Sequence, residues 1–458
     1  MTSTVPPHSI AIIGGGFSGF TVATQLLRAL PGERPILLVE RAHEPGRGLA
    51  YATANADHLL NLRATHMSAD PERPSAFADW LDCTRLDADA QAGIRVTDAG
   101  TFAARGLYGR YISESFERTR AEAGARLDVL RDAVLDLEPI DGGFTLRTES
   151  GRSIPIAGAV LAMGNLPGPV TARSRYQRDP WDVAGLRDLD PTREVLIVGT
   201  GLTMMDAVAT LRRQGFPGRI VAVSRRGLVP KPHAPVPVRA RPEFSAETRA
   251  SIRKLLAWGR AEIAAARAEG ADWRSVIDAL RPITDELWTG LPRLEQARFL
   301  RHLRPYWDVH RHRTAPPAAA TIAGEVARGT LRILAGRLQT VEDATAHAIV
   351  TVQPRGSGRP VQIAAGAILD ATGFSRFAET ADPLVRNLLA RGLVRPGPFG
   401  LGVDATPDGK VVSSRGDAPL WAVGPLLRGV LWECIAVPDI RDASVDLADA
   451  VAARISQD

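Results

Sequence analysis

The sequence is poor in cysteine, lysine and aromatic residues, and each shortage excludes a class of protein. Only two of the 458 residues are cysteines, Cys83 and Cys434, so neither a disulfide framework nor a CxxC redox pair can form. Three of the 56 basic residues are lysines, and aromatic residues make up 5% of the chain. Without a Lys/Arg block or many aromatic residues for stacking, the net charge of +5 does not indicate nucleic-acid binding.

Long apolar runs and several familiar motifs are also missing. No run of eighteen apolar residues predicts a transmembrane helix. The first nine residues lead straight into a strand-like run, so no secretory signal is predicted. We therefore expect a cytoplasmic protein without a membrane partner. No HExxH or Cys/His spacing predicts a metal site, and no GxSxG element predicts a serine nucleophile.

The sequence does contain a βαβ pattern near its start. Apolar and charged fractions of 45% and 23% are those of an ordinary globular chain. Apolar runs and helical periodicity predict a strand at residues 9–13, a helix at residues 20–30 and a strand at residues 35–40. The turn between the first strand and the helix carries the fingerprint Gly14-x-Gly16-x-x-Gly19.

This glycine fingerprint predicts dinucleotide binding. Gly14 permits a tight turn, Gly16 lets a pyrophosphate approach the backbone, and Gly19 lets the helix pack closely on the strand. The positive end of the helix would hold the phosphates. Glu40 follows Gly19 by 21 residues, where an acid can bind ribose hydroxyls. The alternative is a glycine-rich turn in a purely structural βαβ unit.

A second βαβ pattern begins 185 residues after the first. It comprises a strand at residues 194–198, a helix at residues 202–214 and a strand at residues 219–224. Gly199 and Gly201 match the fingerprint, but Met204 takes the place of the third glycine. Because that glycine allows close packing, we expect looser contact between the helix and the strand here.

The spacing in this second unit indicates which nicotinamide cofactor it binds. From Gly199 to Arg225 is 26 residues, the same as from Gly14 to Glu40. Arg225 therefore takes the position of the ribose-binding acid. The planar fork of an arginine can bind a 2′-phosphate, which favours NADPH over NADH. Alternatively, Arg225 and Arg226 belong to a solvated surface.

Two dinucleotide sites in one chain indicate a division of labour in which one holds FAD and the other binds nicotinamide. We assign FAD to the first site, because terminal segments normally complete a flavin domain. The expected fold is α/β, with a Rossmann-like nicotinamide domain inserted in a Rossmann-like FAD domain. The predicted ranges are residues 1–172 and 366–458 for the FAD-binding domain, 173–365 for the NAD(P)H-binding domain and about 243–315 for a helical insertion.

Local signals support this organisation. Two similar phrases, Gly158–Gly164 and Gly366–Gly373, are expected where the chain crosses between the domains. Ser245 and Asp272 are predicted N-caps within the helical insertion. A final helix at residues 437–455 would close the fold, and the dipole at its N-terminus could stabilise an anionic reduced flavin.

Several phrases resemble a known family, namely the bacterial FAD/NAD(P)-binding proteins that include FAD-dependent urate hydroxylase and aspartate N-monooxygenase. The resemblance spans most of the chain and is weakest in the helical insertion. The matching phrases are Gly46-Arg-Gly48-Leu-Ala-Tyr51, His58-Leu-Leu-Asn61, Met67-Ser68, Phe77-Ala-Asp-Trp80-Leu81, Arg105-Gly-Leu-Tyr108-Gly109, Tyr306 to Arg313, Asp370-Ala-Thr-Gly373 and Trp432-Glu433 to Ile440-Arg441.

The resemblance implies further cofactor contacts. It implies that the segment from Arg47 to Met67 wraps FAD, with Asn61 and Arg105 as contacts. Asn61 could equally cap a loop. The phrase ending at Gly373 is similar to one in N-hydroxylating flavin monooxygenases. Many flavoproteins place an aspartate before the last helix, but the segment ending at Gly424 has none, so its flavin contact would fall to the backbone.

The residues that would bind a substrate are less defined. His310 and His312 lie two apart, which suits one face of a strand, and no further metal ligands accompany them. The cluster of His310, Arg311 and Arg313 could bind an anionic substrate. A structural ion pair or plain solvent exposure is the competing interpretation. Trp80, Trp307 and Trp432 are expected in the core rather than against a cofactor, and Cys434 as a small buried residue.

The resemblance implies an FAD-dependent monooxygenase that takes electrons from NADPH or NADH and uses O₂. Its expected reaction is hydroxylation of a small anionic substrate through a flavin C4a-hydroperoxide, with urate converted to 5-hydroxyisourate as the main expectation. The alternatives are N-hydroxylation of an amino acid such as aspartate, or a flavin reductase that inserts no oxygen. A non-catalytic redox sensor is a third possibility. The catalytic residues and the oligomeric state stay open.

Overall fold

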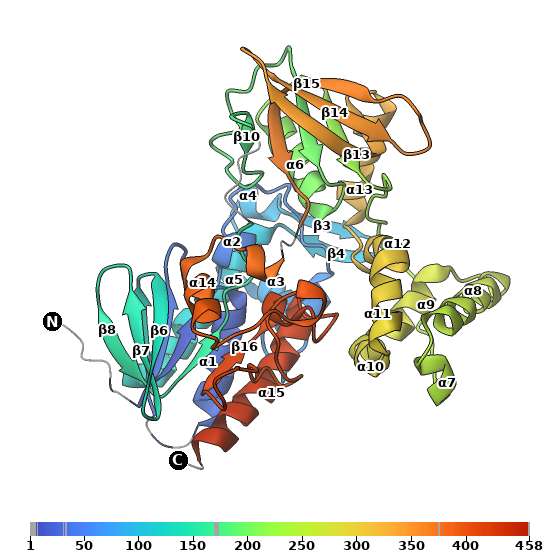
Figure 1. The fold of residues 1–458 in the computed structure, drawn as a ribbon. Coiled ribbons are helices and arrows are strands. Elements are labelled where there is room, and N and C mark those ends of the chain that lie inside the picture. Colours follow the sequence, from blue (N-terminus) through green and yellow to red (C-terminus); the bar gives the residue numbers. More distant parts are fainter. Residues whose placement is uncertain are drawn as a thin grey trace.

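A computed structural model describes residues 6, 8–30, 32, 34–168, 174–373 and 376–456. One parallel sheet and one mostly parallel sheet dominate it, and the second lies above the first in Figure 1. Among the described helices, none has both the length and the apolar character needed to cross a membrane.

The first sheet contains five parallel strands, which run in the order β16-β9-β1-β2-β5. β1 and β2 are buried throughout, as expected for parallel strands covered on both faces. The prediction of the first βαβ unit is confirmed, with no end shifted by more than three residues. The strands are β1 (Ile10–Ile13), β2 (Ile36–Glu40), β5 (Leu127–Arg131), β9 (Gly158–Leu161) and β16 (Leu420–Ala422).

Helices far apart in the sequence pack together beside this sheet. α1 (Phe17–Ala29) lies against α15 (Val437–Ile455), and Thr21 Oγ1 and Ser444 Oγ are 3.0 Å apart in their buried contact. The predicted final helix is confirmed at both ends. α5 (Arg105–Ala123) joins the same core. The other face packs against an antiparallel sheet of β6 (Val134–Ile140), β7 (Gly143–Thr148) and β8 (Ser153–Ile156).

The second sheet has the order β10-β15-β11-β12-β13-β14. Its first five strands are parallel, and β14 is antiparallel to both β13 and β15. The second βαβ unit is confirmed as β11, α6 and β12. The elements are β10 (Gln177–Arg178), β11 (Glu194–Val198), α6 (Leu202–Arg213), β12 (Ile220–Ser224), β13 (Leu331–Asp343), β14 (Ala348–Pro354) and β15 (Val361–Asp370).

The crossings between the sheets differ from the predicted boundaries. β15 pairs with β11 as far as Asp370, so residue 366 lies inside a strand of the second sheet. The return crossing therefore comes after Asp370, because the sequence phrase from Gly366 to Gly373 is the end of a strand rather than a linker. The boundary expected at 172 and 173 lies outside the described residues.

A helical lobe, residues 246–311, extends from the second sheet and is drawn in green-yellow in Figure 1. Ser245 accepts a hydrogen bond from Thr248 N and Asp272 accepts one from Arg274 N, which confirms both predicted caps. The lobe contains α7 (Ala246–Arg249), α8 (Ile252–Ala268), α9 (Trp273–Leu280), η3 (Arg281–Ile283), α10 (Thr284–Gly290), α11 (Arg293–Arg298), η4 (Phe299–Leu303) and α12 (Arg304–Arg311). α13 (Pro316–Ala327) follows and packs on β13.

Aromatic side chains attach this lobe to the last third of the chain. Trp288 and Phe299 of the lobe bury the ring of Trp432, at centroid distances of 5.0 and 5.2 Å. Trp432 is therefore a core residue, as predicted. These buried rings join the lobe to the segment that precedes α15.

Shorter elements complete the described chain. They are α2 (Gly48–Tyr51), η1 (Ala64–His66), α3 (Ala76–Cys83), α4 (Ala88–Gln91), β3 (Ile94–Thr97), β4 (Gly100–Ala103), η2 (Gly124–Arg126), η5 (Phe377–Glu379), α14 (Pro383–Ala390), η6 (Pro398–Gly400) and η7 (Gly424–Leu427).

Candidate functional site

The first glycine turn joins β1 to α1 with very close packing. Gly14 has φ +105°, and a Cβ there would lie 2.5 Å from the carbonyl oxygen of Ala162. A Cβ at Gly19 would lie 1.9 Å from the carbonyl oxygen of Gly14. Gly16 caps α1 without a side-chain hydrogen bond, so the N-terminal N–H groups of this helix are available to an anion.

Glu40 lies at the end of β2 and faces this turn. Its Oε2 accepts a hydrogen bond from Gly15 N at 2.7 Å, and its Oε1 accepts from Ala42 N at 2.8 Å. The carboxylate is buried. Oε1 also accepts from His43 N at 3.1 Å, so Oε2 is the oxygen that keeps a further acceptor position. The predicted ribose-binding acid and the predicted phosphate-binding turn are therefore in direct contact.

Of the residues for which the resemblance implied FAD contacts, Arg47 lies near the first turn and Arg105 does not point there. Arg47 Nε donates to Ser113 Oγ at 2.9 Å, and its neighbour Gly46 donates through its backbone N–H to the carbonyl oxygen of Gly15 at 2.6 Å. The carbonyl oxygen of Asn61 is 2.9 Å from His233 Nε2. Arg105 instead forms an ion pair with Asp206 of α6, at 2.9 Å.

The second glycine turn divides into a tight half and an open half. Gly199 has φ +121°, and a Cβ there would lie 2.2 Å from the carbonyl oxygen of Ala371. At Gly201, the N-cap of α6, a Cβ would meet nothing within 4 Å. Met204 is fully buried, so its side chain fills the space beside the strand instead of leaving it loose. The open backbone at Gly201 fits a bound phosphate.

The two arginines after β12 have different surroundings. Arg225 is exposed. Arg226 Nη1 donates to the hydroxyl of Tyr306 at 3.1 Å, and its guanidinium lies 5.0 Å from the centre of that ring. Arg225 is therefore available to a 2′-phosphate, while Arg226 contacts the helical lobe.

Two further predicted cofactor residues lie at carboxyl ends of strands. Gly373 follows β15 with φ +86°, and a Cβ there would meet none of the described residues within 4 Å. Gly424 follows β16 with φ +70°, and a Cβ there would lie 2.9 Å from Ser18 Oγ in the first turn of α1. Parallel sheets bind their ligands at this end of the strands. A cavity of about 510 Å³ lies at the opposite end of β2 and β5, beside Pro35 and Asp128, and does not fit this rule.

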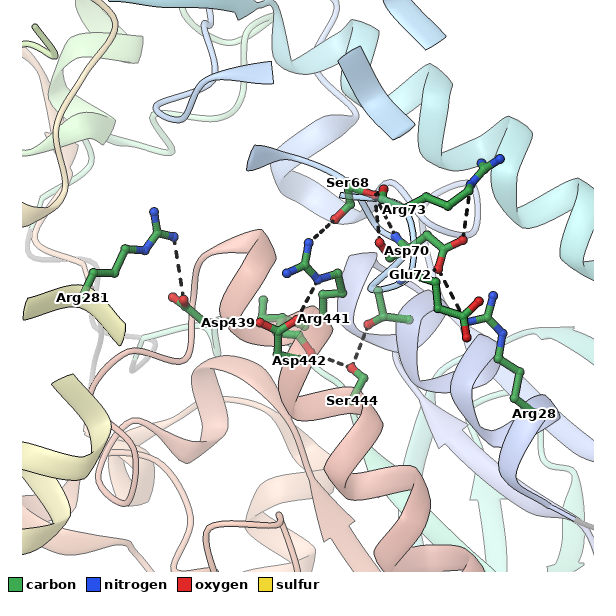
Figure 2. Close-up of polar contacts among 12 residues, drawn as sticks. Arg28, Ser68, Asp70, Glu72, Arg73, Arg281, Asp439, Arg441, Asp442 and Ser444 are labelled. Carbon is green, nitrogen blue, oxygen red and sulfur yellow. Dashed lines mark hydrogen bonds and ion pairs between the residues drawn. The ribbon is translucent and has the colours of Figure 1, made fainter. Parts of the chain in front are cut away.

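The sequence did not predict a group of charged side chains between the helical lobe and the start of α15. We call this group the charged junction, and it contains Arg281, Arg311, Glu433, Asp439 and Arg441. Figure 2 shows Arg281 reaching toward Asp439 from the lobe, with Arg441 turned toward Ser68. Arg441 Nη1 donates to the carbonyl oxygen of Ser68 at 3.5 Å. The loop after η1 and the helical lobe thus both reach α15 through contacts made by arginines.

The contacts inside the charged junction are incomplete. Asp439 lies 3.9 Å from both Arg281 Nη2 and Arg311 Nη2. Among the described residues, the buried atoms Arg281 Nη2, Arg311 Nε and Asp439 Oδ2 have no hydrogen-bond partner. Buried polar atoms are normally satisfied by protein or by a bound molecule. The junction is therefore suited to a polar ligand.

Burial and neighbouring charges alter the titration of this junction. Burial raises the pKa of Asp439 to about 6, although Arg311 and Arg281 lower it. Burial also raises the pKa of Asp285 to about 6; its carboxylate accepts from the backbone N–H of Glu433 at 2.9 Å. Desolvation lowers the pKa of His66, and Arg281 lowers it further.

The residues of the predicted substrate cluster have different surroundings in the structure and do not form one site. His310 belongs to helix α12, not to a strand, and its ring packs against Trp273 at 4.6 Å. Arg311 is buried and pairs with Glu433 at 3.1 Å, while buried Arg313 pairs with Asp278. The competing interpretation of structural ion pairs is thus the better one for these arginines. Val309 and Arg311 are buried and His310 is half-buried. This alternation does not follow the helical period, so periodicity gave no signal of the error.

Comparison with known proteins agrees with this geometry. Residues 11–166 match the FAD-NAD(P)-binding family. No curated protein has a matching sequence. Among solved structures, ornithine hydroxylase from Pseudomonas aeruginosa is 13% identical with a TM-score of 0.64, over 97% of this chain and 99% of that one. L-Lysine 6-monooxygenase from Pseudomonas syringae is 14% identical with a TM-score of 0.62, over 98% and 99%.

A third similar structure contains the cofactors. Ornithine N-hydroxylase from Kutzneria sp. 744, in complex with reduced FAD, NADP⁺ and L-ornithine, is 12% identical with a TM-score of 0.61, over 98% of this chain and 100% of that one. At these identities the likeness concerns the fold. The chain thus has the α/β fold of FAD- and NAD(P)-binding proteins, with two Rossmann-like domains arranged as in flavin-dependent monooxygenases.

Proposed function

We propose that this protein is an FAD-dependent, NADPH-dependent monooxygenase that hydroxylates the nitrogen of a small amino acid. The observation that carries the proposal is the charged junction, which occurs in a chain that also has two glycine turns suited to dinucleotides. Arg281 and Asp439 face each other there with polar atoms that lack hydrogen bonds among the described residues. An amino acid offers one group for each, a carboxylate for the guanidinium and an amine for the carboxylate.

The residues present fit both cofactors. The N–H groups at the start of α1 would bind the pyrophosphate of FAD, and Glu40 would accept hydrogen bonds from its ribose. The start of α6 at Gly201 would bind the pyrophosphate of NADPH, and Arg225 its 2′-phosphate. When bound, FAD accepts a hydride from NADPH and passes electrons to O₂.

The charged junction would orient and deprotonate the substrate. Arg281 and Arg441 come from different elements and could hold a carboxylate between the lobe and α15. Asp439 could take a proton from the substrate ammonium, because its pKa of about 6 keeps it ionised near pH 7. A neutral amine is the nucleophile that N-hydroxylation requires. Walls that exclude water, such as the buried rings of the lobe, would protect the reactive oxygen species.

N-hydroxylation fits better than the urate reaction that the sequence resemblance favoured. The similar structures named above act on ornithine or lysine. The aspartate carboxylate of the junction also matches an amine better than it matches an anionic ring, since like charges repel. Arg311 and Arg313, which the sequence offered as possible ligands of an anionic substrate, are engaged in ion pairs. A cytoplasmic location and a small-molecule partner remain part of the proposal.

The test measures whether oxygen enters an amino acid. The FAD-loaded protein is supplied with NADPH and separately with L-aspartate, L-ornithine, L-lysine or urate. Oxygen uptake, NADPH oxidation, hydroxylamine formation and urate absorbance are followed. The proposal expects a hydroxylamine from one amino acid in step with NADPH oxidation. Loss of urate without any hydroxylamine would overturn it in favour of urate hydroxylase, and hydrogen peroxide as the only product would favour a flavin reductase.

A further inference from the structure

One face of α6 is polar where it meets the FAD-binding side of the molecule. Asp206, Thr210 and Arg213 lie at positions i, i+4 and i+7, so they form a single stripe along the helix. Each of them contacts the segment from residue 53 to residue 59 or the start of α5. We call this set of contacts the α6 seam.

A buried ion pair forms the centre of the seam. Arg105 Nη2 lies 2.9 Å from Asp206 Oδ2, and the two side chains are 14% and 11% exposed. Arg105 Nε also donates to the carbonyl oxygen of Leu59 at 3.3 Å. The ring of Trp181, which follows β10, lies 5.8 Å from the guanidinium. The pair is therefore covered by protein on the nicotinamide side as well.

A buried histidine extends the seam along the same helix. His58 Nε2 lies 2.8 Å from Thr210 Oγ1 and 3.1 Å from the carbonyl oxygen of Asp206. Its Nδ1 lies 2.9 Å from Thr53 Oγ1. Burial lowers the pKa of His58, so the imidazole is neutral at pH 7. Because a carbonyl can only accept, the proton is on Nε2, and Nδ1 accepts from Thr53.

We propose that Arg105 and His58 are positioning residues, which hold α6 in one orientation and thereby place the nicotinamide against the flavin. The inference rests on the proposed function, in which the N-terminus of α6 binds the NADPH pyrophosphate. Asp206 is five residues from Gly201 on the same rigid helix, so a rotation at the seam moves the cofactor. Hydride transfer needs close approach of the two reacting atoms, and a displacement of about 1 Å can lower a rate about 100-fold.

The composition of the seam favours orientation over stability. A buried ion pair adds little net stability compared with packed apolar residues, because both charges lose their hydration. Asp206 Oδ2 has no hydrogen bond among the described residues, so its 2.9 Å contact with Arg105 is a charge contact. The contact still restricts the position of α6, because separating the two buried charges would leave each without a partner. The apolar residues of α6, among them Val208 and Leu211, pack on the other face against the second sheet. The seam is therefore additional to the contacts that hold the domain together.

The test compares two routes of electrons to FAD in the holoenzyme without oxygen. In Asp206→Asn, and in the neutral pair of Arg105→Gln with Asp206→Asn, NADPH should reduce the flavin at least about tenfold more slowly. Reduction by dithionite, which needs no nicotinamide domain, should be unchanged. The dissociation constant of NADP⁺, read from the flavin absorbance, should stay within about threefold of wild type, because the phosphate contacts are intact.

Arg213→Gln is the matched control. Arg213 lies on the same stripe and pairs with Asp57 at 3.0 Å, but the two side chains are 52% and 42% exposed. Exposed pairs contribute little, so this variant should behave as wild type in both reductions. Thr210→Val, which removes one of the partners of His58 without unpairing a charge, should slow NADPH-driven reduction in the same direction as Asp206→Asn.

Hydrogen exchange gives a readout that is independent of turnover. Amides in residues 53–59 should exchange faster in Asp206→Asn than in Arg213→Gln. The inference is overturned if the exchange of this segment is unchanged, or if Asp206→Asn, the neutral pair and Thr210→Val all reduce the flavin at the wild-type rate. Failure of the proposed function looks different, because NADPH and NADH would then not reduce the wild-type flavin at all. In that case the exchange measurement alone decides whether the seam fixes α6.

Discussion

Asp439 Oδ1 lies 3.9 Å from Arg281 Nη2, and this contact connects the helical lobe to the first turn of α15. The distance is too long for a hydrogen bond, so the two groups form an ion pair without a hydrogen bond between them. Arg311 lies equally far from the other carboxylate oxygen. A small zwitterion bound beside these groups would give each of them a hydrogen bond that it lacks.

Replacing Arg281 should weaken substrate binding. In Arg281→Gln the KM for the amino acid that yields a hydroxylamine should rise about 10- to 100-fold, since a hydrogen bond to a charged group contributes about 1.5–3 kcal/mol. NADPH-driven flavin reduction without substrate should be unchanged. Arg301→Gln, an exposed arginine of the same lobe, serves as the control in steady-state assays. An unchanged KM in Arg281→Gln would remove this residue from the substrate site.

The pKa of Asp439 predicts a pH dependence of stability. Burial raises it from 3.8 to about 6, so the folded protein binds more protons than the unfolded chain between these values. The free energy of unfolding contributed by this group therefore falls as pH rises from about 4 to about 6, by up to about 3 kcal/mol. Asp439→Asn cannot titrate and should lack this fall.

The measurement is the difference between the two proteins, from urea unfolding at pH 4.5, 5.5 and 6.5. Burial lowers the pKa values of His233 and His312 to about 4, and these groups act with the opposite sign in the same range. They are common to both proteins, so they cancel in the difference. A constant difference across the range would mean that Asp439 titrates normally.

The cofactor turns could be predicted from the sequence because local rules determine them. Gly14 and Gly199 require positive φ, and each turn begins where a buried strand ends. These are properties of adjacent residues. The 26-residue spacing placed Glu40 beside its turn because the βαβ unit has a nearly fixed length. The same regularity explains why the predicted strand and helix ends differ so little from the observed ones.

The charged junction and the α6 seam could not be predicted because they depend on tertiary packing. Arg281 and Asp439 are 158 residues apart in the sequence, and nothing near Arg281 distinguishes it from the many other arginines. Arg105 was expected at the flavin because its neighbouring phrase resembles flavoproteins, but the orientation of α5 directs it to Asp206. The roles of Arg311 and Arg313 were difficult to predict for the same reason, because burial decides whether an arginine binds a ligand or an internal carboxylate.

Arg225 should determine the choice of nicotinamide cofactor. In Arg225→Asp the KM for NADPH should rise about tenfold or more while the KM for NADH changes little, because only NADPH carries the 2′-phosphate. Arg219→Asp makes the same charge change at the other end of β12, also at an exposed position. Steady-state oxidation of each cofactor measures the effect. Equal changes for both cofactors in Arg225→Asp would show that the residue does not contact the phosphate.

The two glycines of the second turn should respond differently to alanine. Gly199→Ala places a Cβ 2.2 Å from the carbonyl oxygen of Ala371, at a residue whose φ is +121°. The clash and the unfavourable backbone conformation should lower the melting temperature and loosen the packing of the nicotinamide domain. Gly201→Ala meets nothing within 4 Å, and the backbone there has φ −84°, so the protein should keep its melting temperature. The new methyl group would instead occupy the space that a pyrophosphate needs, and the dissociation constant of NADP⁺ should rise by about tenfold or more. Titration of the flavin absorbance with NADP⁺ and thermal unfolding of both variants separate the two effects. Wild-type NADP⁺ affinity in a folded Gly201→Ala protein would mean that the phosphate binds elsewhere than at the start of α6.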